Sequence, residues 1–232
     1  MVQIRRAILP QNASNVPGRT MTPLYITVHN TANTSHGANA EMHKNYLHNG
    51  SGGRQASWHY TVDDTEIWQT LEDFQQGWHA GDGSGSGNTR SIGIEICENS
   101  DGNFNRATEN AQWLINQLMS TNNISLGNVV SHSHWSGKYC PRKLLPTWDN
   151  FKAGIENQGP PTLYKVQIGA FSERENAAQL ADQATEAGFD NFIVHEGGLY
   201  KVQIGAFSDR GNAQALADQA SNAGFDVYIV QE

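Results

Sequence analysis

A 34-residue segment occurs twice in this 232-residue chain, and it constrains the fold more than any other feature. Residues 163–196, LYKVQIGAFSERENAAQLADQATEAGFDNFIVHE, recur at residues 199–232 with 25 of 34 positions identical. The period of 36 residues is typical of a repeated supersecondary unit. Because one copy buries too little apolar surface to fold alone, we expect both copies to pair into one compact domain.

Each copy has the pattern of a strand, a helix and a second strand. In YKVQIGAF, Val166, Ile168 and Ala170 alternate with Lys165 and Gln167, as in a strand with one buried face. The following ENAAQLADQATEAG is typical of a helix that ends at a glycine, and NFIV of a second strand. We therefore predict two βαβ repeats that form a small α+β domain with a four-stranded sheet.

A short linker precedes the repeats. The stretch ENQGPPT is rich in proline, glycine and polar residues, so we place a linker at residues 158–162, between a first domain at residues 1–157 and the repeat domain at 163–232. The formal net charge of -8 is uneven, with 11 basic and 13 acidic residues before Gln158 and 4 basic and 10 acidic residues after it. Since nucleic-acid binding normally needs a basic patch, this balance argues against a nucleic-acid partner.

The duplicated YKVQIGAF unit resembles the SPOR family of peptidoglycan-binding domains over nearly all of residues 163–232. The resemblance implies binding to the glycan strands of the bacterial cell wall, which suits a surface that is not basic. Candidate contacts are Gln167, Phe171, Gln203 and Phe207, although the two phenylalanines could belong to the core instead. The alternative is a small domain that dimerises or only acts as a spacer.

The first domain mixes strand and helix patterns, which predicts an α/β fold with a mixed central β-sheet flanked by helices. In the helix at residues 39–50, Met42 and Tyr46 are expected on the inner face. The strand at residues 91–99 places Glu95 and Cys97 on one face. The other predicted elements are strands at 24–32 and 128–134, a hairpin at 56–71, and helices at 107–123 and 148–157.

Metal-ligand side chains gather in VVSHSHWSGKYCPRK, residues 129–143. Zn²⁺ favours imidazole nitrogen and thiolate sulfur, and His29 at the end of a strand could join a histidine and Cys140 from this stretch. Three protein ligands leave a fourth position open, which is the arrangement of a catalytic zinc site. Spacing alone does not decide between His132 and His134. A disulfide between Cys97 and Cys140 remains an alternative.

Three motifs, ITVHNTA, SIGIEIC and SHSHWSGKYCP, resemble the zinc-dependent N-acetylmuramoyl-L-alanine amidase family, which also includes the peptidoglycan recognition proteins. The resemblance spans roughly residues 20–155. It implies one Zn²⁺ held by His29, His132 and Cys140.

The same resemblance implies roles for four further residues. Glu95 would act as the general base on a zinc-activated water, and Lys138 would stabilise the oxyanion. An exposed strand carboxylate and a solvated lysine are the alternatives for these two. His59 and His79 resemble positions that line the substrate cleft, and they are candidate contacts to the stem peptide or sugar.

The resemblance leaves Cys97 without a ligand role, so we expect it to be a small buried residue. The tryptophans could either form aromatic walls for the substrate or pack in the core. The ones in question are Trp58, Trp68, Trp78 and Trp135.

These features together predict a peptidoglycan hydrolase that cleaves the amide bond between N-acetylmuramic acid and L-alanine. The alternatives are a non-catalytic peptidoglycan-binding protein with a structural zinc, and a zinc-stabilised assembly protein at the wall. The first residues, MVQIRRAILPQNASN, contain an apolar run too short for a signal peptide, and no segment has the length of a membrane span. We therefore expect synthesis in the cytoplasm and action on the wall after release, as for a phage endolysin or a bacterial autolysin.

Overall fold

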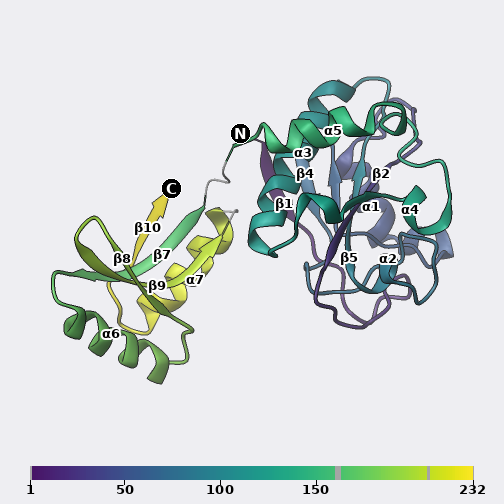
Figure 1. The fold of residues 1–232 in the computed structure, drawn as a ribbon. Helices are drawn as coiled ribbons and strands as arrows, with labels where there is room; N and C mark the ends of the chain where they lie inside the picture. Colours follow the sequence, from purple (N-terminus) through teal and green to yellow (C-terminus); the bar gives the residue numbers. More distant parts are fainter. Residues whose placement is uncertain (1, 160–162, 208–209, 232) are drawn as a thin grey trace. The chain divides into compact units, whose positions relative to one another are not determined.

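The computed structural model describes residues 2–159, 163–207 and 210–231, and the chain divides into two compact units, Met1–Gly159 and Pro160–Glu232 (Figure 1). Of the predicted linker at residues 158–162, residues 160–162 lie outside the described part. The two units are considered one at a time. Among the described helices, none combines the length and the apolar character needed to cross a membrane.

The first unit is built on a six-stranded mixed sheet, in agreement with the α/β prediction. Its strands are β1 (Gln3–Arg6), β2 (Tyr25–Asn30), β3 (Tyr60–Val62), β4 (Glu66–Gln69), β5 (Ser91–Ile96) and β6 (Val129–Ser131). Their order is β1-β4-β3-β5-β2-β6, in which only the β3–β4 hairpin is antiparallel. Strands β2 and β5 therefore lie inside the sheet, with neighbours on both edges.

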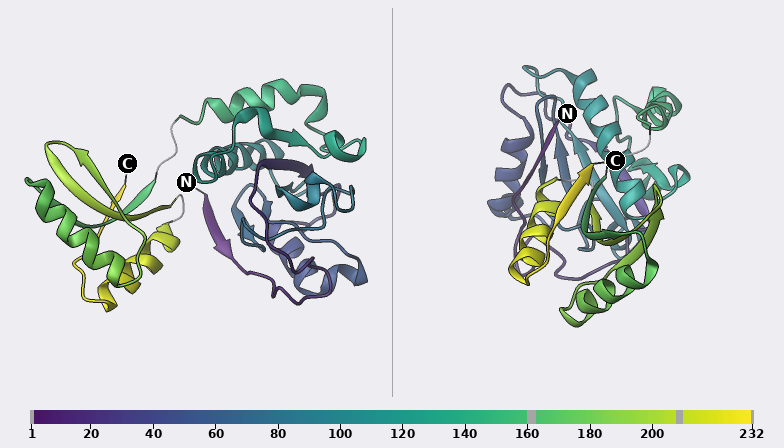
Figure 2. Two further views of the ribbon diagram at one scale, coloured as in Figure 1. Left: turned by 60° about the horizontal axis from the view of Figure 1, so that its bottom comes forward. Right: turned by 90° about the vertical axis from the view of Figure 1, so that its left-hand side faces the viewer.

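Helices cover both faces of this sheet. The α-helices are α1 (Ala40–His48), α2 (Ser86–Thr89), α3 (Phe104–Thr121), α4 (Ser133–Ser136) and α5 (Trp148–Glu156); three short 3-10 helices are η1 (Gly50–Gly53), η2 (Leu126–Asn128) and η3 (Leu145–Thr147). Helices α3 and α5 share the main core with β2 and β5, whereas α1 packs in a separate cluster through Leu47. The right-hand view of Figure 2 shows α1 and the α3–α5 pair on opposite sides of the sheet.

The patterns of β2 and β5 explain why they are central. Ile26, Val28, Ile92, Ile94 and Ile96 are completely buried, as expected for strands covered on both faces. Polar side chains alternate with them on the other face of each strand. Helix α3 presents its apolar stripe to this core, so the periodicity of the sequence and the packing agree.

Two sequence-based expectations for the first unit are wrong in detail. Helix α1 buries Ala40, His43 and Leu47, whereas Met42 and Tyr46 are only half-buried. The last strand ends at Ser131 and the chain turns at once into α4, so the predicted strand at 128–134 is too long. A strand of three residues gives too little periodicity to place its end from sequence.

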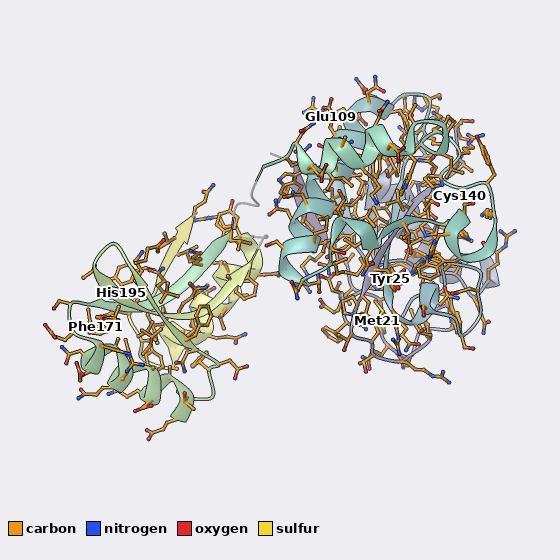
Figure 3. The ribbon with its side chains drawn as sticks, viewed as in Figure 1. Met21, Tyr25, Glu109, Cys140, Phe171 and His195 are labelled. Carbon is orange, nitrogen blue, oxygen red and sulfur yellow. The ribbon has the colours of Figure 1, made fainter. Side chains whose placement is uncertain are left out.

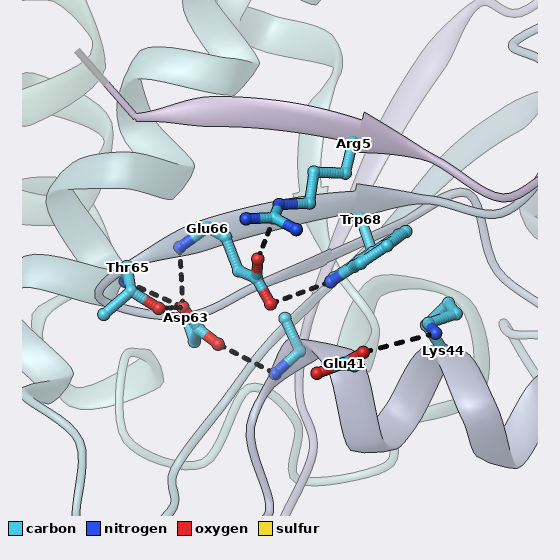
Figure 4. A network of polar contacts seen from close by, with 8 residues as sticks. Arg5, Glu41, Lys44, Asp63, Thr65, Glu66 and Trp68 are labelled. Carbon is cyan, nitrogen blue, oxygen red and sulfur yellow. Dashed lines mark hydrogen bonds and ion pairs between the residues drawn. The ribbon is translucent and has the colours of Figure 1, made fainter.

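Asp63 organises the β3–β4 turn and the start of α1 (Figure 4). One carboxylate oxygen accepts hydrogen bonds from the backbone N–H groups of Thr65 and Glu66 at 2.7 and 2.8 Å, and the other accepts from the N–H of Ala40 at 2.9 Å. Figure 4 also shows Glu66 joined to Arg5 of β1 and to the indole of Trp68. The Trp68 ring lies under the Lys44 ammonium, 4.5 Å from its centroid, so Trp68 has a structural role.

The second unit is a four-stranded antiparallel sheet with two helices, as the repeats predict. Its elements are β7 (Tyr164–Phe171), α6 (Arg174–Glu186), β8 (Phe192–Glu196), β9 (Leu199–Phe207), α7 (Arg210–Asn222) and β10 (Tyr228–Gln231). The strand order is β10-β7-β9-β8. Both helices cover the same face of the sheet, where their alanines pack on Val166, Ile168, Val202 and Ile204 (Figures 1 and 2).

The two copies of the repeat are interleaved within this sheet. Strand β8 of the first copy pairs with β9 of the second, and β10 of the second copy pairs with β7 of the first. The first strands of the two copies, β7 and β9, pair at the centre. Neither copy forms a sheet by itself, which is the physical reason for the duplication.

Candidate functional site

The candidate ligands and acid–base group meet at one end of the parallel strands. His29 on β2 is the register partner of Glu95 on β5, so both side chains lie on the same face of the sheet. His132 follows directly after β6, whose Ser131 pairs with Val28 of β2. The carboxyl ends of neighbouring parallel strands form a common edge, and there the fold brings together residues far apart in sequence.

His29, His132 and Cys140 form a tight, buried cluster. Nδ1 of His29 lies 2.9 Å from Nδ1 of His132 and 3.9 Å from Sγ of Cys140, and all three ligand atoms lie within 4.8 Å of one another. Their exposed fractions are only 1, 5 and 5%. Figure 3 shows Cys140 on the loop that follows α4. Among the described residues this is the one cluster of three metal-ligand side chains.

Hydrogen bonds determine which imidazole nitrogens carry protons. Nε2 of His79 lies 3.2 Å from the Ser91 carbonyl, which can only accept, so this nitrogen is protonated. In neutral His79, Nδ1 then accepts from Nε2–H of His29 at 3.1 Å. An interaction with the Ala80 backbone raises the pKa of His132, which requires the imidazole to be the donor. We assign it to Nε2, because this nitrogen lies beside Gly81, at 3.5 Å from the place of a Cβ there, and Nδ1 faces His29. Both ligands thus direct an unprotonated Nδ1 into the cluster.

Two lone pairs facing each other at 2.9 Å repel unless a positive charge lies between them. A proton is disfavoured: burial lowers the pKa of His29 well below its usual value, and the neighbouring His79, His132 and Lys138 lower it further. Burial, followed by Lys138, likewise lowers the pKa of His132. Two imidazole nitrogens and one sulfur are the donor set that Zn²⁺ prefers, so the residues present fit this ion.

Burial raises the pKa of the Cys140 thiol to about 11, although a hydrogen bond from the Asn30 backbone and the charge of Lys138 oppose the shift. Without a cation the side chain is therefore a thiol at neutral pH. Metal binding would displace this proton, because only the thiolate is a strong ligand.

An ion pair anchors the loop after Cys140. Arg142 pairs with Glu98, whose side chain is fully buried, through Nε at 3.2 and 3.0 Å and also through its terminal nitrogen. The backbone N–H of Ser133 also donates to the Cys140 carbonyl at 3.0 Å. These contacts hold the sulfur against the end of β2.

Glu95 lies opposite His29 on the neighbouring strand and lines a pocket. Its Oε2 is buried and has no hydrogen-bond partner in the described part of the chain, and the residue lines a pocket of about 430 Å³. Burial raises the pKa of its carboxyl to about 8, opposed by Lys138 and increased by Glu98. A cation in the neighbouring cluster would act in the same direction as Lys138 and favour the carboxylate.

Lys138 is exposed, and its charge influences every member of the site. It lowers the pKa values of His29, His132, Glu95 and Cys140, so its ammonium group lies within electrostatic reach of all four side chains. That position suits a group that stabilises negative charge developing beside the cluster.

The remaining predicted histidines differ in their surroundings. His59 is fully buried, and its two ring nitrogens contact the Gly93 N–H at 2.9 Å and the Gln75 carbonyl at 2.8 Å, which leaves no atom for a substrate. His79 is directed at His29. His134 is exposed on α4, its ring packs against Trp135, and it lies outside the cluster.

Cys97 and Cys140 are both free thiols, so the alternative of a disulfide between them is wrong. Cys97 is buried, as expected, and its sulfur lies 3.9 Å from Nδ1 of His43. Trp58 lines the pocket beside Glu95, whereas the Trp135 indole donates to Thr27 at 2.8 Å.

The sequence patterns did not identify two further residues of the pocket. Thr31 follows β2, and its Oγ1 is buried without a partner among the described residues. Arg54 contributes an exposed guanidinium. Thr31 belongs to the ITVHNTA motif, two residues after His29, so the sequence could have indicated its place near the site. Arg54 lies in an irregular segment that has no such pattern.

In the second unit, one row of side chains crosses the sheet face that the helices leave open. Tyr228 is opposite Gln167, Gln167 is opposite Gln203, and Gln203 is opposite Phe192. The two aromatic side chains are 62 and 53% exposed, whereas the two glutamines between them are buried.

The phenylalanines proposed as glycan contacts lie elsewhere. Phe171 and Phe207 are half-buried and pack against the core beside Gly169 and Gly205. Figure 3 labels Phe171 in this unit.

Comparison with known proteins agrees with both parts of the chain. Residues 19–143 match the model of the N-acetylmuramoyl-L-alanine amidase family, and residues 160–231 match that of the SPOR domain. The chain belongs to the N-acetylmuramoyl-L-alanine amidase family. The first unit is called the amidase unit below, and the second the SPOR unit.

Two relatives from Bacillus subtilis (strain 168) have names that state their activity. The N-acetylmuramoyl-L-alanine amidase XlyA is 62% identical over 169 residues, which are 73% of this chain and 56% of XlyA. The N-acetylmuramoyl-L-alanine amidase CwlH is 55% identical over 162 residues, 69% of this chain and 64% of CwlH. The chain therefore spans less than two thirds of the length of either relative. The solved catalytic domain of XlyA superposes with a TM-score of 0.64 at 64% identity, covering 66% of this chain and 99% of that domain.

Proposed function

We propose that the protein is a peptidoglycan hydrolase that cleaves the amide bond between N-acetylmuramic acid and L-alanine, with one Zn²⁺ held by His29, His132 and Cys140. The observation that carries the proposal is the pair of facing Nδ1 lone pairs beside Cys140, next to a pocket in which Glu95 has a buried oxygen without a partner. Membership of the amidase family supports it.

An amide is a weak electrophile with a poor leaving group, so its hydrolysis needs an activated water, a stabilised oxyanion and a proton for the departing nitrogen. When bound, zinc would supply a Lewis acid that brings the pKa of water to about 7. Glu95 would take the proton of the attacking water and pass it to the leaving amine, because it lines the pocket beside the ligand cluster.

Lys138 would stabilise the negative charge that develops on the carbonyl oxygen. Its positive charge already acts on all four site residues, and its exposure leaves the ammonium group free to approach a bound substrate. The coupling to Glu95 shows that this exposed ammonium group lies close enough to the site to act on charge there, which supports the catalytic role.

The pocket beside Glu95 would hold the substrate next to the reacting bond. It combines an apolar wall of Met42, Tyr46 and Trp58 with the polar groups of Thr31 and Arg54. Such a lining suits a sugar or a short peptide, which presents both apolar faces and hydrogen-bonding groups.

The SPOR unit, residues 163–232, would bind wall glycan and hold the catalytic domain, residues 1–157, at its substrate through the linker at 158–162. The open sheet face offers Tyr228 and Phe192 for stacking on sugar rings, and Gln167 and Gln203 for hydrogen bonds. Tethering raises the effective concentration of substrate at the catalytic domain. We infer action on the wall after release from the producing cell, as in a phage endolysin or a bacterial autolysin.

Digestion of purified cell walls tests the proposal. The wild-type protein with zinc is expected to release new L-alanine amino termini, and Glu95→Gln is expected to keep one zinc per chain while losing about 10²–10⁴-fold in turnover. His134→Ala is the matched control, because it removes an exposed imidazole outside the cluster and should change neither zinc content nor turnover. Bound zinc in a folded wild-type protein without new amino termini would refute the hydrolase and favour a wall-binding protein with a structural zinc.

A further inference from the structure

We infer that the loop His79–Asn88, called the clamp loop below, holds both imidazole ligands in the Nε2–H tautomer. In this assignment His79 is a positioning residue for His29, the Ala80 carbonyl positions His132, and Asn88 fixes the backbone that carries both. The inference rests on the proposed metal site and extends it to residues that do not touch the metal.

The contact between His79 and His29 has a defined direction. Because the Ser91 carbonyl must accept, His79 places its one proton on Nε2 and offers Nδ1 as an acceptor. His29 Nε2 lies 3.1 Å away, and the two rings meet edge to face at 88°. If His29 carried its proton on Nδ1 instead, the His79–His29 contact would join two acceptors and the ligand atom would be blocked.

The position of the His79 ring depends on Gly93. A Cβ at this position of β5 would lie 2.7 Å from Cγ of His79, so any larger residue would push the ring away from His29. The backbone N–H of Gly93 in turn donates to Nδ1 of His59 at 2.9 Å. His59 therefore supports the strand beneath His79, which explains why it is completely buried.

Asn88 links the two halves of the clamp loop. Its side-chain oxygen accepts from the backbone N–H of His79 at 2.9 Å and from that of Ala80 at 2.8 Å. Its own Nδ2 donates to the Gly83 carbonyl at 2.9 Å, and its backbone N–H donates to Asp82 at 3.1 Å. One buried amide thus fixes the backbone of His79 and of Ala80, the two groups that orient His29 and His132.

This arrangement prepares the ligands before a metal arrives. Ligand histidines commonly donate their second N–H to a carboxylate or a carbonyl, which orients the ring. A neutral imidazole at this place orients His29 without adding negative charge, so Cys140 would be the one anionic ligand of the ion. Hydrogen bonds that orient both rings in this way would lower the cost of ordering the site when a metal binds.

Two measurements on the full-length chain test the assignment: the ¹⁵N chemical shifts of the histidine rings in the zinc-stripped protein, and the zinc Kd from competition with a chromophoric chelator. In the wild type, His29 and His132 are expected as Nε2–H tautomers. His79→Phe removes the acceptor, so His29 alone should shift towards Nδ1–H, and the zinc Kd should rise about 10–100-fold. His79→Gln, whose amide can accept and donate, should restore much of this affinity.

Two further variants distinguish positioning from a general loss of structure. Gly93→Ala keeps the imidazole but displaces it, and should alter the His29 shifts as His79→Phe does. Asn88→Ala should alter the ring shifts of His132 as well as those of His29, whereas His79→Phe should alter those of His29 alone.

An unchanged His29 tautomer and an unchanged zinc Kd in folded His79→Phe and Gly93→Ala would overturn the role of His79. Unchanged His132 in Asn88→Ala would overturn the role of the clamp loop for that ligand. Failure of the wild type to bind zinc would refute the proposed function. It would leave the tautomer assignment standing, because the tautomers are measured in the zinc-stripped protein.

Discussion

The amidase unit and the SPOR unit differ in where they place their candidate functional side chains. In the amidase unit, His29, His132 and Cys140 come from distant segments and are buried together. In the SPOR unit, two copies of one segment form a sheet with an open face that carries the exposed Tyr228 and Phe192. Among the described residues, the buried side-chain atoms without a hydrogen-bond partner all lie in the amidase unit: Asn30 Nδ2, Thr31 Oγ1, Glu95 Oε2, Asn116 Oδ1 and Gln117 Oε1.

The buried polar atoms without a partner are concentrated near the candidate site of the amidase unit. Three of these five atoms lie at or beside the ligand cluster: Asn30 Nδ2, Thr31 Oγ1 and Glu95 Oε2. Such atoms are available to a metal or a substrate because the fold itself does not satisfy them. The described residues of the SPOR unit include no such atom. We therefore expect substitutions on its open sheet face to have little effect on folding. Substitutions in the two units are therefore expected to differ in their effects on turnover, wall binding and stability.

Replacing Cys140 by Ser should have the largest effect. The variant loses the one anionic ligand, so turnover on purified walls should fall to the level of the chelator-treated wild type. The stability of the amidase unit is measured separately, because all six tryptophans lie in residues 1–159 and their fluorescence reports on that unit alone. Zinc should raise the unfolding temperature of the wild type and leave that of Cys140→Ser unchanged.

Cys97→Ala is the matched control, since Cys97 is equally buried but lies outside the cluster. It should keep one zinc per chain. Retention of zinc in Cys140→Ser together with its loss in Cys97→Ala would reverse the ligand assignment.

Lys138→Met should lower kcat by about 10²–10³-fold while zinc content and unfolding temperature stay at wild-type values. The side chain is exposed and acts on the site through its charge, so its removal leaves the fold intact. Lys152→Met, on helix α5, is the control for loss of one positive charge. Equal kcat values for the two variants would rule out the oxyanion role of Lys138.

Truncating the aromatic row should affect the other unit only. Tyr228→Ala and Phe192→Ala are each expected to raise the Kd for purified walls by about 5–30-fold, which corresponds to about 1–2 kcal/mol. Cleavage of a small soluble muropeptide should stay constant, because the amidase unit is unchanged. Phe74→Ala removes an exposed aromatic of the amidase unit and should leave wall affinity unaltered. Unchanged wall affinity in a variant that carries both Tyr228→Ala and Phe192→Ala would exclude this sheet face as the glycan site.

The last prediction concerns the stability of the metal-free protein and its dependence on Glu95. Its pKa of about 8 in the folded state exceeds the usual 4.5, so between these values the unfolded chain releases a proton that the folded chain retains. The free energy of unfolding of the wild type should therefore fall from pH 5 to pH 8 relative to Glu95→Gln. Urea titrations followed by tryptophan fluorescence measure this difference, in which the contributions of the buried histidines cancel. Parallel curves for the two proteins would show that the Glu95 carboxyl is not perturbed by burial.

Much of the fold could be predicted because its signals are local. Alternation in SIGIEIC places Glu95 opposite the apolar face, and the repeat places Gln167 and Gln203 in equivalent positions. The choice between His132 and His134 was not available locally. It depends on β6 ending at Ser131, after which the helical turn of α4 directs His134 to solvent.

Periodicity, duplication and ligand chemistry are properties of short segments. The two kinds of unit, the residue types of the candidate ligand set and the resemblance to wall amidases could therefore be read from the sequence. The fold was needed to see that the two repeat copies exchange strands, that His59 contacts the backbone of β5 and that His79 contacts His29. Strand exchange and hydrogen-bond direction depend on neighbours that are distant in sequence, and the pattern of a short segment does not identify such neighbours.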